Sequence, residues 1–368
     1  MPIYMDRHDV SETVTAENVA QLHQQDLKIQ DQFGCRGLTY WFDGKRQTAF
    51  CLIEAPDVES LKKMHDHAHG QVPHSVIEVD ARIVESFLGR IEDPEKSQNT
   101  VLNIINDPAF RTIMVIRVKR LSLKQNDLTQ FKSSLHHYSN AILNLLNVYE
   151  GTPVKQTEDH FLVSFKSVSN AVYAAFDIQS LLKESRNDMN NSKILFKIGL
   201  SGGVPVTEKK LIFEETIKLA ERMCAVVKGE IIVSSEVKAL YNSENTNALI
   251  DGESRLVLTQ EDERFLTLLM DYTESAWSNT NLKVDDFSKP VGYSKSQLYR
   301  KMILLTGKSP NTFLKEYRLN EALLLLNKST RNISEVAFET GFSSPSYFSK
   351  CFQKRYGHLP SGYLPHKA

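Results

Sequence analysis

The amino-acid sequence predicts a multidomain protein in which two α+β units precede an all-α unit with two helix-turn-helix motifs. Strand and helix patterns alternate through most of the 368 residues, and the C-terminal part repeats a single helical pattern. The two parts also differ in charge. From Asn281 onward the chain has 14 Lys and Arg against 6 Asp and Glu, a net charge of +8, which leaves −9 upstream. The basic C-terminal unit is therefore expected to meet nucleic acid, with a solvated basic face as the alternative.

The first unit, residues 1–90, is predicted to have the order strand, helix, strand, strand, helix, strand. Apolar spacing and turn residues place these elements at residues 3–5, 16–33, 38–42, 48–53, 57–69 and 75–79. Asp26 interrupts the apolar stripe of the first helix. This order is the split βαβ pattern of a ferredoxin-like α+β sandwich. Residues 91–110, with Asp93 and Pro94 in a polar stretch, are predicted to form a linker.

Histidine is concentrated in this first unit, which holds six of the eleven in the chain. His65 and His69 are four residues apart on a predicted helix, so both imidazoles lie on one face and could hold a transition metal. A solvated helix face is the alternative that this spacing leaves open. His67 and His74 are predicted to be surface residues, and Cys51 is predicted to be packed in its strand.

The second unit, residues 111–251, is predicted to be another α+β layer structure. The expected strands are at residues 112–118, 161–165, 194–200 and 230–233, with a further strand that pairs with the second. The expected helices are at residues 128–148, 168–182 and 217–226. Residues 252–280 are predicted to connect this unit to the next one through an acidic helix at 261–277.

The third unit, residues 281–368, contains the repeat. Its first copy has Val284, Phe287, Val291, Gly292, Tyr293 and Ser294, and its second copy has Ile333, Val336, Thr340, Gly341, Phe342 and Ser343. Each copy is typical of a short helix, a glycine turn and a second helix. A helix fits the major groove of DNA and can contact base edges there. The repeat therefore predicts a sequence-specific transcriptional regulator that binds double-stranded DNA.

In the first copy, Ser294 and Gln297 have the spacing of a capping box, which fixes where the recognition helix begins. Leu298 and Met302 are then expected to face the core. The outward residues that we expect to contact DNA are Ser296, Gln297, Arg300 and Lys301. Gln297 and Arg300 are the predicted base readers, because glutamine pairs with adenine and arginine with guanine, whereas Lys301 is expected to contact phosphate.

In the second copy, Ser343 or Ser344 is expected to cap the recognition helix, with Pro345 as its first residue. Phe348 and Phe352 are predicted to point inward. The outward residues are Ser346, Ser349, Lys350 and Gln353. Short hydroxyl side chains read bases less selectively, so this helix is expected to depend more on phosphate contacts. A helix at residues 310–326 would join the two copies.

The C-terminal unit closely resembles the AraC/XylS family of bacterial transcription regulators. The resemblance rests on GYSKSQLYRKMILLTGKSPNTFLKEYRLNEALLLL and ISEVAFETGFSSPSYFSKCFQKRYGHLPSGY. It implies a tandem helix-turn-helix domain and double-stranded DNA as a partner, with RNA polymerase as a further candidate. Pro290 departs from the family pattern near the end of the first short helix and is expected to bend or shorten it.

The first unit resembles a small bacterial nickel-binding family with a ferredoxin-like fold. MDRHDV, the stretch from His23 to Leu27, LTYWFDGKRQTAFCLIEAP and MHDHAHG carry this resemblance. It implies nickel or another divalent transition metal as a cofactor. The implied ligand candidates are His8, His23, His65 and His69. Because they come from a strand end and two helices, a second copy of the chain is one way to complete the site.

The middle unit resembles the nucleotide cyclase homology domain of class III adenylate and guanylate cyclases. RTIMVIRV, TEDHFLVSF, KIGLSGGVPV and IKLAERMCAVVKGEIIVS carry the resemblance. Arg117 stands where the family has its first metal-binding aspartate, and Lys218 stands where it has asparagine. A cation at Arg117 would repel the magnesium that this chemistry requires, so the resemblance implies a pseudoenzyme that dimerises or relays a signal. Asp159 and Arg222 are kept and could form a vestigial nucleotide site, with an ordinary ion pair or helix surface as the alternative.

These patterns lead to a dimeric transcriptional regulator that is not an enzyme and whose output is changed by a metal or a small molecule. Alternatives are an active purine nucleotide cyclase with a DNA-binding appendage, and a module for metal storage or delivery. No apolar run has the roughly 20 residues that a membrane helix needs, and the N-terminus lacks a signal-peptide core, so a cytoplasmic location without membrane partners is expected. The four scattered cysteines indicate neither a disulfide framework nor a thiolate zinc site.

Overall fold

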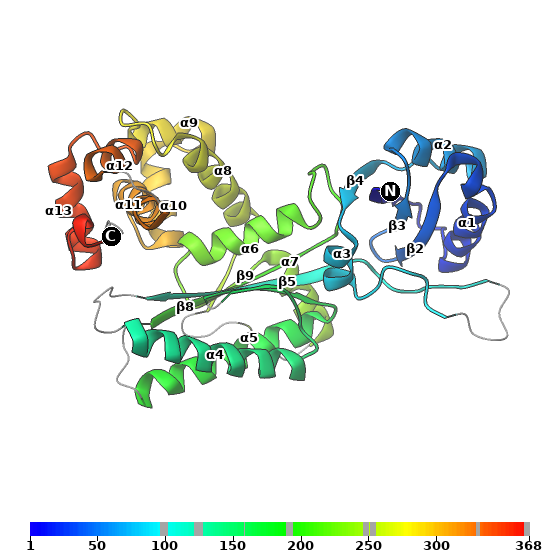
Figure 1. Ribbon diagram of the computed structural model, residues 1–368, viewed down its shortest axis with the longest axis horizontal. Helices are drawn as coiled ribbons and strands as arrows, with labels where there is room; N and C mark the ends of the chain where they lie inside the picture. Colours follow the sequence, from blue (N-terminus) through cyan, green and yellow to red (C-terminus); the bar gives the residue numbers. More distant parts are fainter. Residues whose placement is uncertain are drawn as a thin grey trace, which may run out of the picture.

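The structure is a computed structural model that describes residues 1–95, 102–120, 128–157, 159–188, 194–245, 250, 255–328 and 332–363. Figure 1 shows a ferredoxin-like N-terminal unit and a helical C-terminal unit on either side of a middle unit built on a larger sheet. Among the described helices, none is both long enough and apolar enough to cross a membrane.

The N-terminal unit has an antiparallel sheet of four strands in the order β2-β3-β1-β4, as the predicted element order requires. The strands are β1 (Ile3–Asp9), β2 (Arg36–Asp43), β3 (Thr48–Glu54) and β4 (Ser75–Val79). Two helices, α1 (Ala16–Ile29) and α2 (Val58–His69), pack on one face of this sheet. The short 3-10 helix η1 (Gln30–Phe33) extends α1 to the predicted end of that helix.

A third helix, α3 (Ala81–Leu88), follows strand β4 at the end of the predicted first unit and was not predicted. Asp80 caps it by accepting hydrogen bonds from the backbone N–H groups of Arg82 and Ile83. The helix lies against strands β6 (Thr152–Gln156) and β7 (His160–Phe165) of the middle sheet. Its C-terminal carbonyls, on Phe87 and Leu88, accept hydrogen bonds from the buried guanidinium of Arg111 at 3.0 and 3.1 Å. The α3 helix is therefore fixed to the middle unit.

The second face of the N-terminal sheet is also covered. Strand alternation turns Met5, Trp41 and Leu52 away from α1 and α2, and these residues share one apolar core with α3 and the middle unit. The described part of the predicted linker packs as well, because the N–H of Phe42 donates to the carbonyl of Asp107 at 3.1 Å. Residues 96–101 of that predicted linker lie outside the described residues. The two units are thus joined by a buried interface.

The middle unit has a sheet of six strands in the order β10-β9-β8-β5-β7-β6. Its strands are β5 (Arg111–Arg120), β6 (Thr152–Gln156), β7 (His160–Phe165), β8 (Ile194–Gly203), β9 (Ile231–Val233) and β10 (Arg255–Val257). The first four repeat the strand order of the N-terminal sheet, and β9 and β10 add two parallel strands beyond β8. The helices are α4 (Leu128–Val148), α5 (Val168–Asp188), α6 (Glu214–Val226) and α7 (Ser235–Glu244). Of these elements, α7 and β10 were not predicted.

Helices cover both faces of the middle sheet. On one face α4, α5 and α7 share a core with the strands. On the other face α6 and α3 share the interface core with the N-terminal unit. In the described part of the chain, helices thus lie against both faces of the middle sheet, and its edge strands are β6 and β10. Dimerisation stays a prediction.

The C-terminal unit is helical, as predicted. Its elements are α8 (Gln260–Ala276), the 3-10 helix η3 (Val284–Phe287), α9 (Ser288–Val291), α10 (Lys295–Thr306), α11 (Pro310–Lys328), α12 (Ile333–Glu339), α13 (Pro345–Tyr356) and the 3-10 helix η4 (Pro360–Tyr363). In the first motif the short helix is split into η3 and α9. Pro290 lies in the first turn of α9, where a missing N–H leaves no intrahelical bond unmade.

The two helix-turn-helix motifs have separate cores. The first motif, α9 and α10, shares its core with α8 and with Met223, Val227 and Ile232 of the middle unit. The second motif, α12 and α13, packs on the last half of α11. Its turn contains Gly341, where a Cβ atom would lie 2.8 Å from the carbonyl oxygen of Trp277, so only glycine fits there.

Candidate metal centre and nucleic-acid interface

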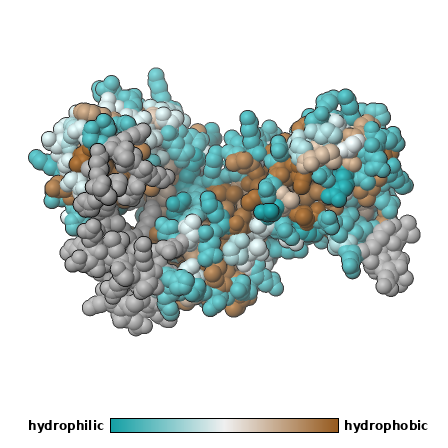
Figure 2. All heavy atoms as spheres, in the orientation of Figure 1, coloured by the Kyte–Doolittle hydropathy of each residue, from teal (hydrophilic) through white to brown (hydrophobic). Residues whose placement is uncertain are grey.

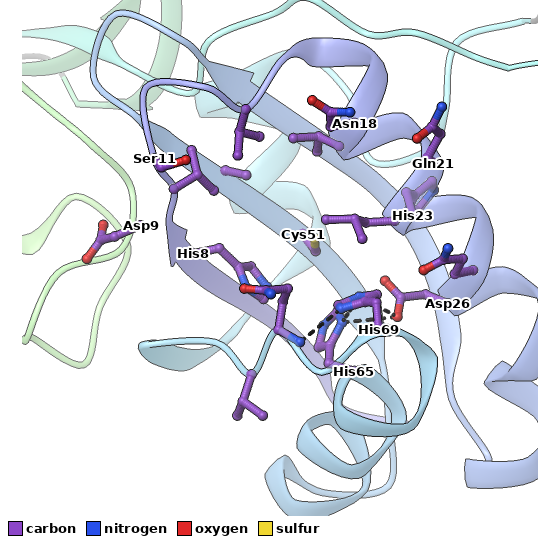
Figure 3. Close-up of a pocket in the computed structure, with 18 of the residues that line it drawn as sticks. His8, Asp9, Ser11, Asn18, Gln21, His23, Asp26, Cys51, His65 and His69 are labelled. Atoms are coloured by element: carbon purple, nitrogen blue, oxygen red, sulfur yellow. Dashed lines mark hydrogen bonds and ion pairs between the residues drawn. The ribbon is translucent and has the colours of Figure 1, made fainter.

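A buried group of nitrogen, oxygen and sulfur atoms lies between the N-terminal sheet and its helices (Figure 3). Asp6 and His8 alternate on β1, so both face α1 and α2. Cys51 lies directly opposite Asp6 in the register of β1 and β3. His65 and His69 lie one turn apart on α2.

Two sets of candidate ligands share the ring of His65. The first set is Asp6, His8, Cys51 and His65, and the second is Asp26, His65 and His69. His65 Nε2 lies 3.0 Å from Asp6, and His65 Nδ1 lies 3.1 Å from Asp26 and 3.3 Å from Nε2 of His69. A cavity of about 440 Å³ adjoins both sets. His65 is therefore the central residue of the group.

The electrostatics of the group follow from its burial. Burial alone would lower the pKa of His65, but hydrogen bonds to Asp26 and Asp6 outweigh it and raise the pKa to about 10. Burial alone would raise the pKa of Asp6, yet the charge of His8 and the hydrogen bond from His65 hold it well below its usual range. Burial and the neighbouring Asp6 raise the pKa of the Cys51 thiol, which stays protonated without a metal.

These shifts predict how the stability of the metal-free N-terminal unit depends on pH. The folded pKa of His65 is above its ordinary value of 6.5, so its stabilising contribution is complete below pH 6.5 and is lost as the pH rises through 10. We expect the free energy of unfolding of this unit to fall by at most about 1.4 kcal/mol per pH unit in that window. Urea unfolding between pH 6.5 and 10 measures it, and a His65→Ala variant with the same slope would contradict the assignment.

The structure brings together three of the four histidines predicted from the sequence. His23 lies outside both sets, because its Nε2 pairs with Asp93 at 3.2 Å and its ring contacts Tyr40. Asp6, Asp26 and Cys51 were missed as ligand candidates. A signal for Asp26 was available, since a carboxylate in the apolar stripe of a helix must find a buried partner. Because His8, His65 and His69 converge in one chain, a second copy is not needed to assemble this group.

The group fits a divalent transition metal. Nε2 of His8 is buried and makes no hydrogen bond with the described residues, although it lies within ion-pair distance of Asp6 Oδ1, at 3.4 Å. An unsatisfied buried nitrogen that faces a carboxylate and a second imidazole is the arrangement expected of a metal ligand. Imidazole, carboxylate and thiol ligands together suit nickel, zinc or copper better than magnesium or calcium.

The first recognition helix, α10, has the predicted inner face. Leu298, Met302 and Leu305 are fully or almost fully buried. Ser296 and Arg300 are exposed, as predicted. Tyr299, which was not among the predicted outward residues, is also exposed, at 52%. Arg300 makes no hydrogen bond or ion pair with any described residue, so its guanidinium is available for DNA.

Two predicted DNA contacts in α10 are already engaged in the protein. Gln297 is exposed, but its Oε1 accepts hydrogen bonds from the backbone N–H of Ser294 at 3.0 Å and from the Ser294 hydroxyl at 2.7 Å. This confirms the capping box and competes with pairing to adenine. Lys301 was predicted to face outward and is instead 15% exposed, with its Nζ 2.7 Å from Asp262 of α8. Spacing alone could not indicate α8 as its neighbour.

The second recognition helix, α13, also has the predicted arrangement. Ser344 caps it and Pro345 is its first residue. Phe348 and Phe352 are buried. Of the predicted outward residues, Ser346, Lys350 and Gln353 are exposed and Ser349 is half-buried. The outer face of α13 therefore has Lys350 where α10 has Arg300, and the exposed Lys354 and Arg355 follow in its last turn.

The two residues predicted for a vestigial nucleotide site, Asp159 and Arg222, each have a partner within the protein. Arg222 is buried and donates to Asp271 and Glu274 of α8, at 2.6 and 2.8 Å. Asp159 is exposed and accepts from the Thr157 hydroxyl at 2.9 Å. Arg117 pairs with Glu221, which also lies 2.7 Å from His160. Arg222 therefore fixes α8 to α6, and the cationic Arg117 is held where the resemblance would require an aspartate.

Two regions of the chain match known protein families. Residues 287–365 match a family model described as helix-turn-helix domain. Residues 4–79 match a model described as nickel responsive protein SCO4226-like. The second match covers both candidate ligand sets, and the first covers α10 and α13.

Several curated proteins and solved structures are similar to parts of the chain. Histidine kinase P4 of Formosa agariphila is 37% identical over 32% of this chain and 9% of its own length. The HTH-type transcriptional regulators MtrA of Neisseria gonorrhoeae and ExsA of Pseudomonas aeruginosa are 32% and 33% identical, over 26% and 28% of this chain and 30% and 37% of their own lengths. The chain thus spans well under two thirds of the length of these curated relatives.

Among solved structures, SCO4226 from Streptomyces coelicolor is 28% identical, with coverage of 21% of this chain and 94% of that one and a TM-score of 0.20. An AraC-type regulator from Chromobacterium violaceum is 29% identical, with coverage of 27% and 88% and a TM-score of 0.25. From the two family models, the chain carries a helix-turn-helix domain at its C-terminal end and a domain similar to SCO4226-like nickel-responsive proteins at its N-terminal end.

Proposed function

We propose that this protein is a transcriptional regulator that binds double-stranded DNA through α10 and α13 and is not an enzyme. The observation that carries this proposal is the paired arrangement of the two helices. Each buries one apolar face, with Leu298 and Met302 on α10 and Phe348 and Phe352 on α13, and each leaves a cation exposed, Arg300 on α10 and Lys350 on α13. Arginine on such a helix can pair with guanine through two hydrogen bonds, whereas lysine is a point charge suited to phosphate.

Selection of bound duplexes from a random pool tests DNA binding, with the full-length protein at low salt. We expect a two-part operator, because one chain presents two recognition helices. Arg300→Ala should relax preference at one base pair by about 1 to 3 kcal/mol and change affinity for random DNA much less. Equal losses on the operator and on random DNA would refute base reading by Arg300.

Lys301→Ala is the matched control on the same helix. Lys301 pairs with α8, so this change should lower the thermal stability of the first motif and leave the selected sequence unchanged. A change of the preferred base in Lys301→Ala, with stability intact, would instead indicate that Lys301 leaves α8 and contacts DNA.

We further propose that a divalent transition metal, with nickel as the first candidate, is the effector that the N-terminal unit binds. His8, Cys51 and Asp6, or Asp26 and His69, would hold it together with His65. A bound metal would supply positive charge to the buried carboxylates, which would replace the proton on His65. The family match of residues 4–79 supports nickel in particular.

A route for coupling begins on strand β1. Asp6 and His8 belong to the candidate ligands and face α1 and α2, while the alternate residues Met5 and Arg7 face the middle unit. A shift of β1 on metal binding would therefore move side chains in the apolar core between the N-terminal and middle units. From there, α6 reaches α8 through Arg222, and α8 reaches α10 through Lys301. Sensing requires that the two states of this route bind the metal with different affinity.

Operator affinity measured with and without micromolar nickel separates sensing from metal storage or delivery. A regulator that senses nickel should change its operator affinity, and the change should disappear in His8→Ala. Tight nickel binding with unchanged operator affinity would favour storage or delivery instead. We also propose that the middle unit is a noncatalytic domain similar to nucleotide cyclases. The proposed protein partners are a second copy of the chain and RNA polymerase.

A further inference from the structure

A second cavity lies at the junction of the N-terminal and middle units. It has a volume of about 580 Å³, within the range of small-molecule sites. Its walls come from Ile83 and Phe87 of α3, Val154 and Leu162 of the middle sheet, and Ile217 of α6. In Figure 2, apolar residues gather over this junction, where Figure 1 places α3, α6 and β4.

Apolar side chains at the mouth of this cavity remain exposed to water. Leu211 is 65% exposed and Ile83 is 39% exposed. Apolar side chains that stay exposed to water raise the free energy of the protein. An apolar molecule bound in the cavity would remove them from water and so lower it. The cavity is separate from the candidate metal centre, which lies on the other face of the N-terminal sheet.

The charges at the rim indicate the kind of ligand. Two lysines and three acids surround the mouth: Lys155, Lys218, Glu78, Asp80 and Glu214. Lys218 pairs with Glu214 at 2.6 Å, and Asp80 caps α3. The remaining two, Lys155 and Glu78, have opposite charges and form no ion pair with the described residues. A charged ligand would therefore meet both signs at the rim and would lose hydration against apolar walls.

We propose that this cavity binds an uncharged, mainly apolar small molecule. Such a ligand would contact α3, the middle sheet and α6 together, and so would fix the N-terminal unit against the middle unit. It would also act on α6, the helix that holds α8 through Arg222. The site is independent of the proposed metal centre, so the regulator would have a second effector of a different chemical class.

Displacement of a fluorescent probe tests this proposal in the full-length protein. The probe is 1-aminoanthracene, which is uncharged at neutral pH, and the competitors are 1-octanol, octanoate and octylamine. The fluorescence of the probe should rise on binding and fall on addition of 1-octanol. Octanoate and octylamine should displace the probe only at concentrations at least about tenfold higher. No rise in fluorescence would overturn the site, and octanoate or octylamine as effective as octanol would overturn the uncharged ligand class.

Variants locate the binding. Ile83→Trp should fill the cavity and lower the affinity for the probe at least about tenfold. Val148→Trp is the control, because Val148 lies on α4 on the opposite side of the sheet and is 72% exposed, and it should leave this affinity unchanged. Leu211→Trp gives the same test at a side chain of the mouth that is more exposed, at 65%. Undiminished probe binding in both Ile83→Trp and Leu211→Trp would refute the assignment. His8→Ala should bind the probe like the wild type, which separates this proposal from the metal proposal.

Discussion

His65→Ala should abolish nickel retention and destabilise the N-terminal unit. The change removes the one ring shared by both candidate ligand sets, so neither set is complete. It also leaves the buried carboxylates of Asp6 and Asp26 without their shared partner. Loss of one partner from a buried charged group costs about 3 to 5 kcal/mol. Nickel titration calorimetry and urea unfolding of the metal-free protein measure the two effects, and we expect nickel affinity to fall by more than about 100-fold.

His67→Ala is the matched control, because His67 lies on the same helix, is exposed and contacts the ring of Phe33. It should keep both nickel binding and stability. Where His65→Ala does not fold, His8→Ala separates the effects, since Nε2 of His8 makes no hydrogen bond in the metal-free protein. His8→Ala should weaken nickel binding and cost less stability than His65→Ala, because His8 neighbours one buried carboxylate, Asp6, whereas His65 contacts two. Unchanged nickel stoichiometry and affinity in both variants would rule out the proposed ligands.

Phe348→Ala should unfold the second helix-turn-helix motif and remove its contacts with DNA. Phe348 is fully buried between Phe342 and Phe352, at ring distances of 5.2 and 5.6 Å. Truncation of a buried phenylalanine costs about 3 to 5 kcal/mol, which is comparable to the stability of a small unit. The first motif has a separate core, so we expect its half of the operator to stay protected.

Hydroxyl-radical footprinting of the selected operator measures this result. Protection should disappear over the half-site of α13 and persist over that of α10. Phe338→Ala provides the control, because Phe338 is on α12 of the same motif and is 52% exposed. It should leave the footprint and the melting temperature nearly unchanged. Loss of both half-sites in Phe348→Ala would mean that the two cores are coupled.

The sequence predicted most elements because their signals are local. The recognition helices were predicted from capping residues and from apolar residues at helical spacing, and Leu298, Met302, Phe348 and Phe352 are buried as expected. The four-stranded order of the N-terminal sheet also followed from the order of its elements. In these places, local propensity and the tertiary fold favour the same structure.

The missed features depend on contacts between distant parts of the chain. Lys301 has the spacing of a surface residue, and only the position of α8 gives it a partly buried ion pair with Asp262. Arg222 was linked to a nucleotide site by resemblance, whereas its partners Asp271 and Glu274 lie about 50 residues away. The helix α3 was missed because it is short and directly precedes the predicted linker, and its apolar face is stabilised by the middle unit. Residue spacing contains no information about such partners.

The placement of α8 determines where an expressed fragment that contains the C-terminal unit can begin. Phe265, Leu266 and Leu269 of α8 are buried against residues of α10 and α11 in one core. An expressed fragment that begins at Asn281 would lack this helix and expose the apolar side chains that it covers. One that begins before Thr259 would keep α8 but present a bare surface where Met223 and Val227 had packed. Isolated preparations are thus expected to aggregate more readily than the intact chain, which makes the latter the better material for crystallisation with an operator duplex.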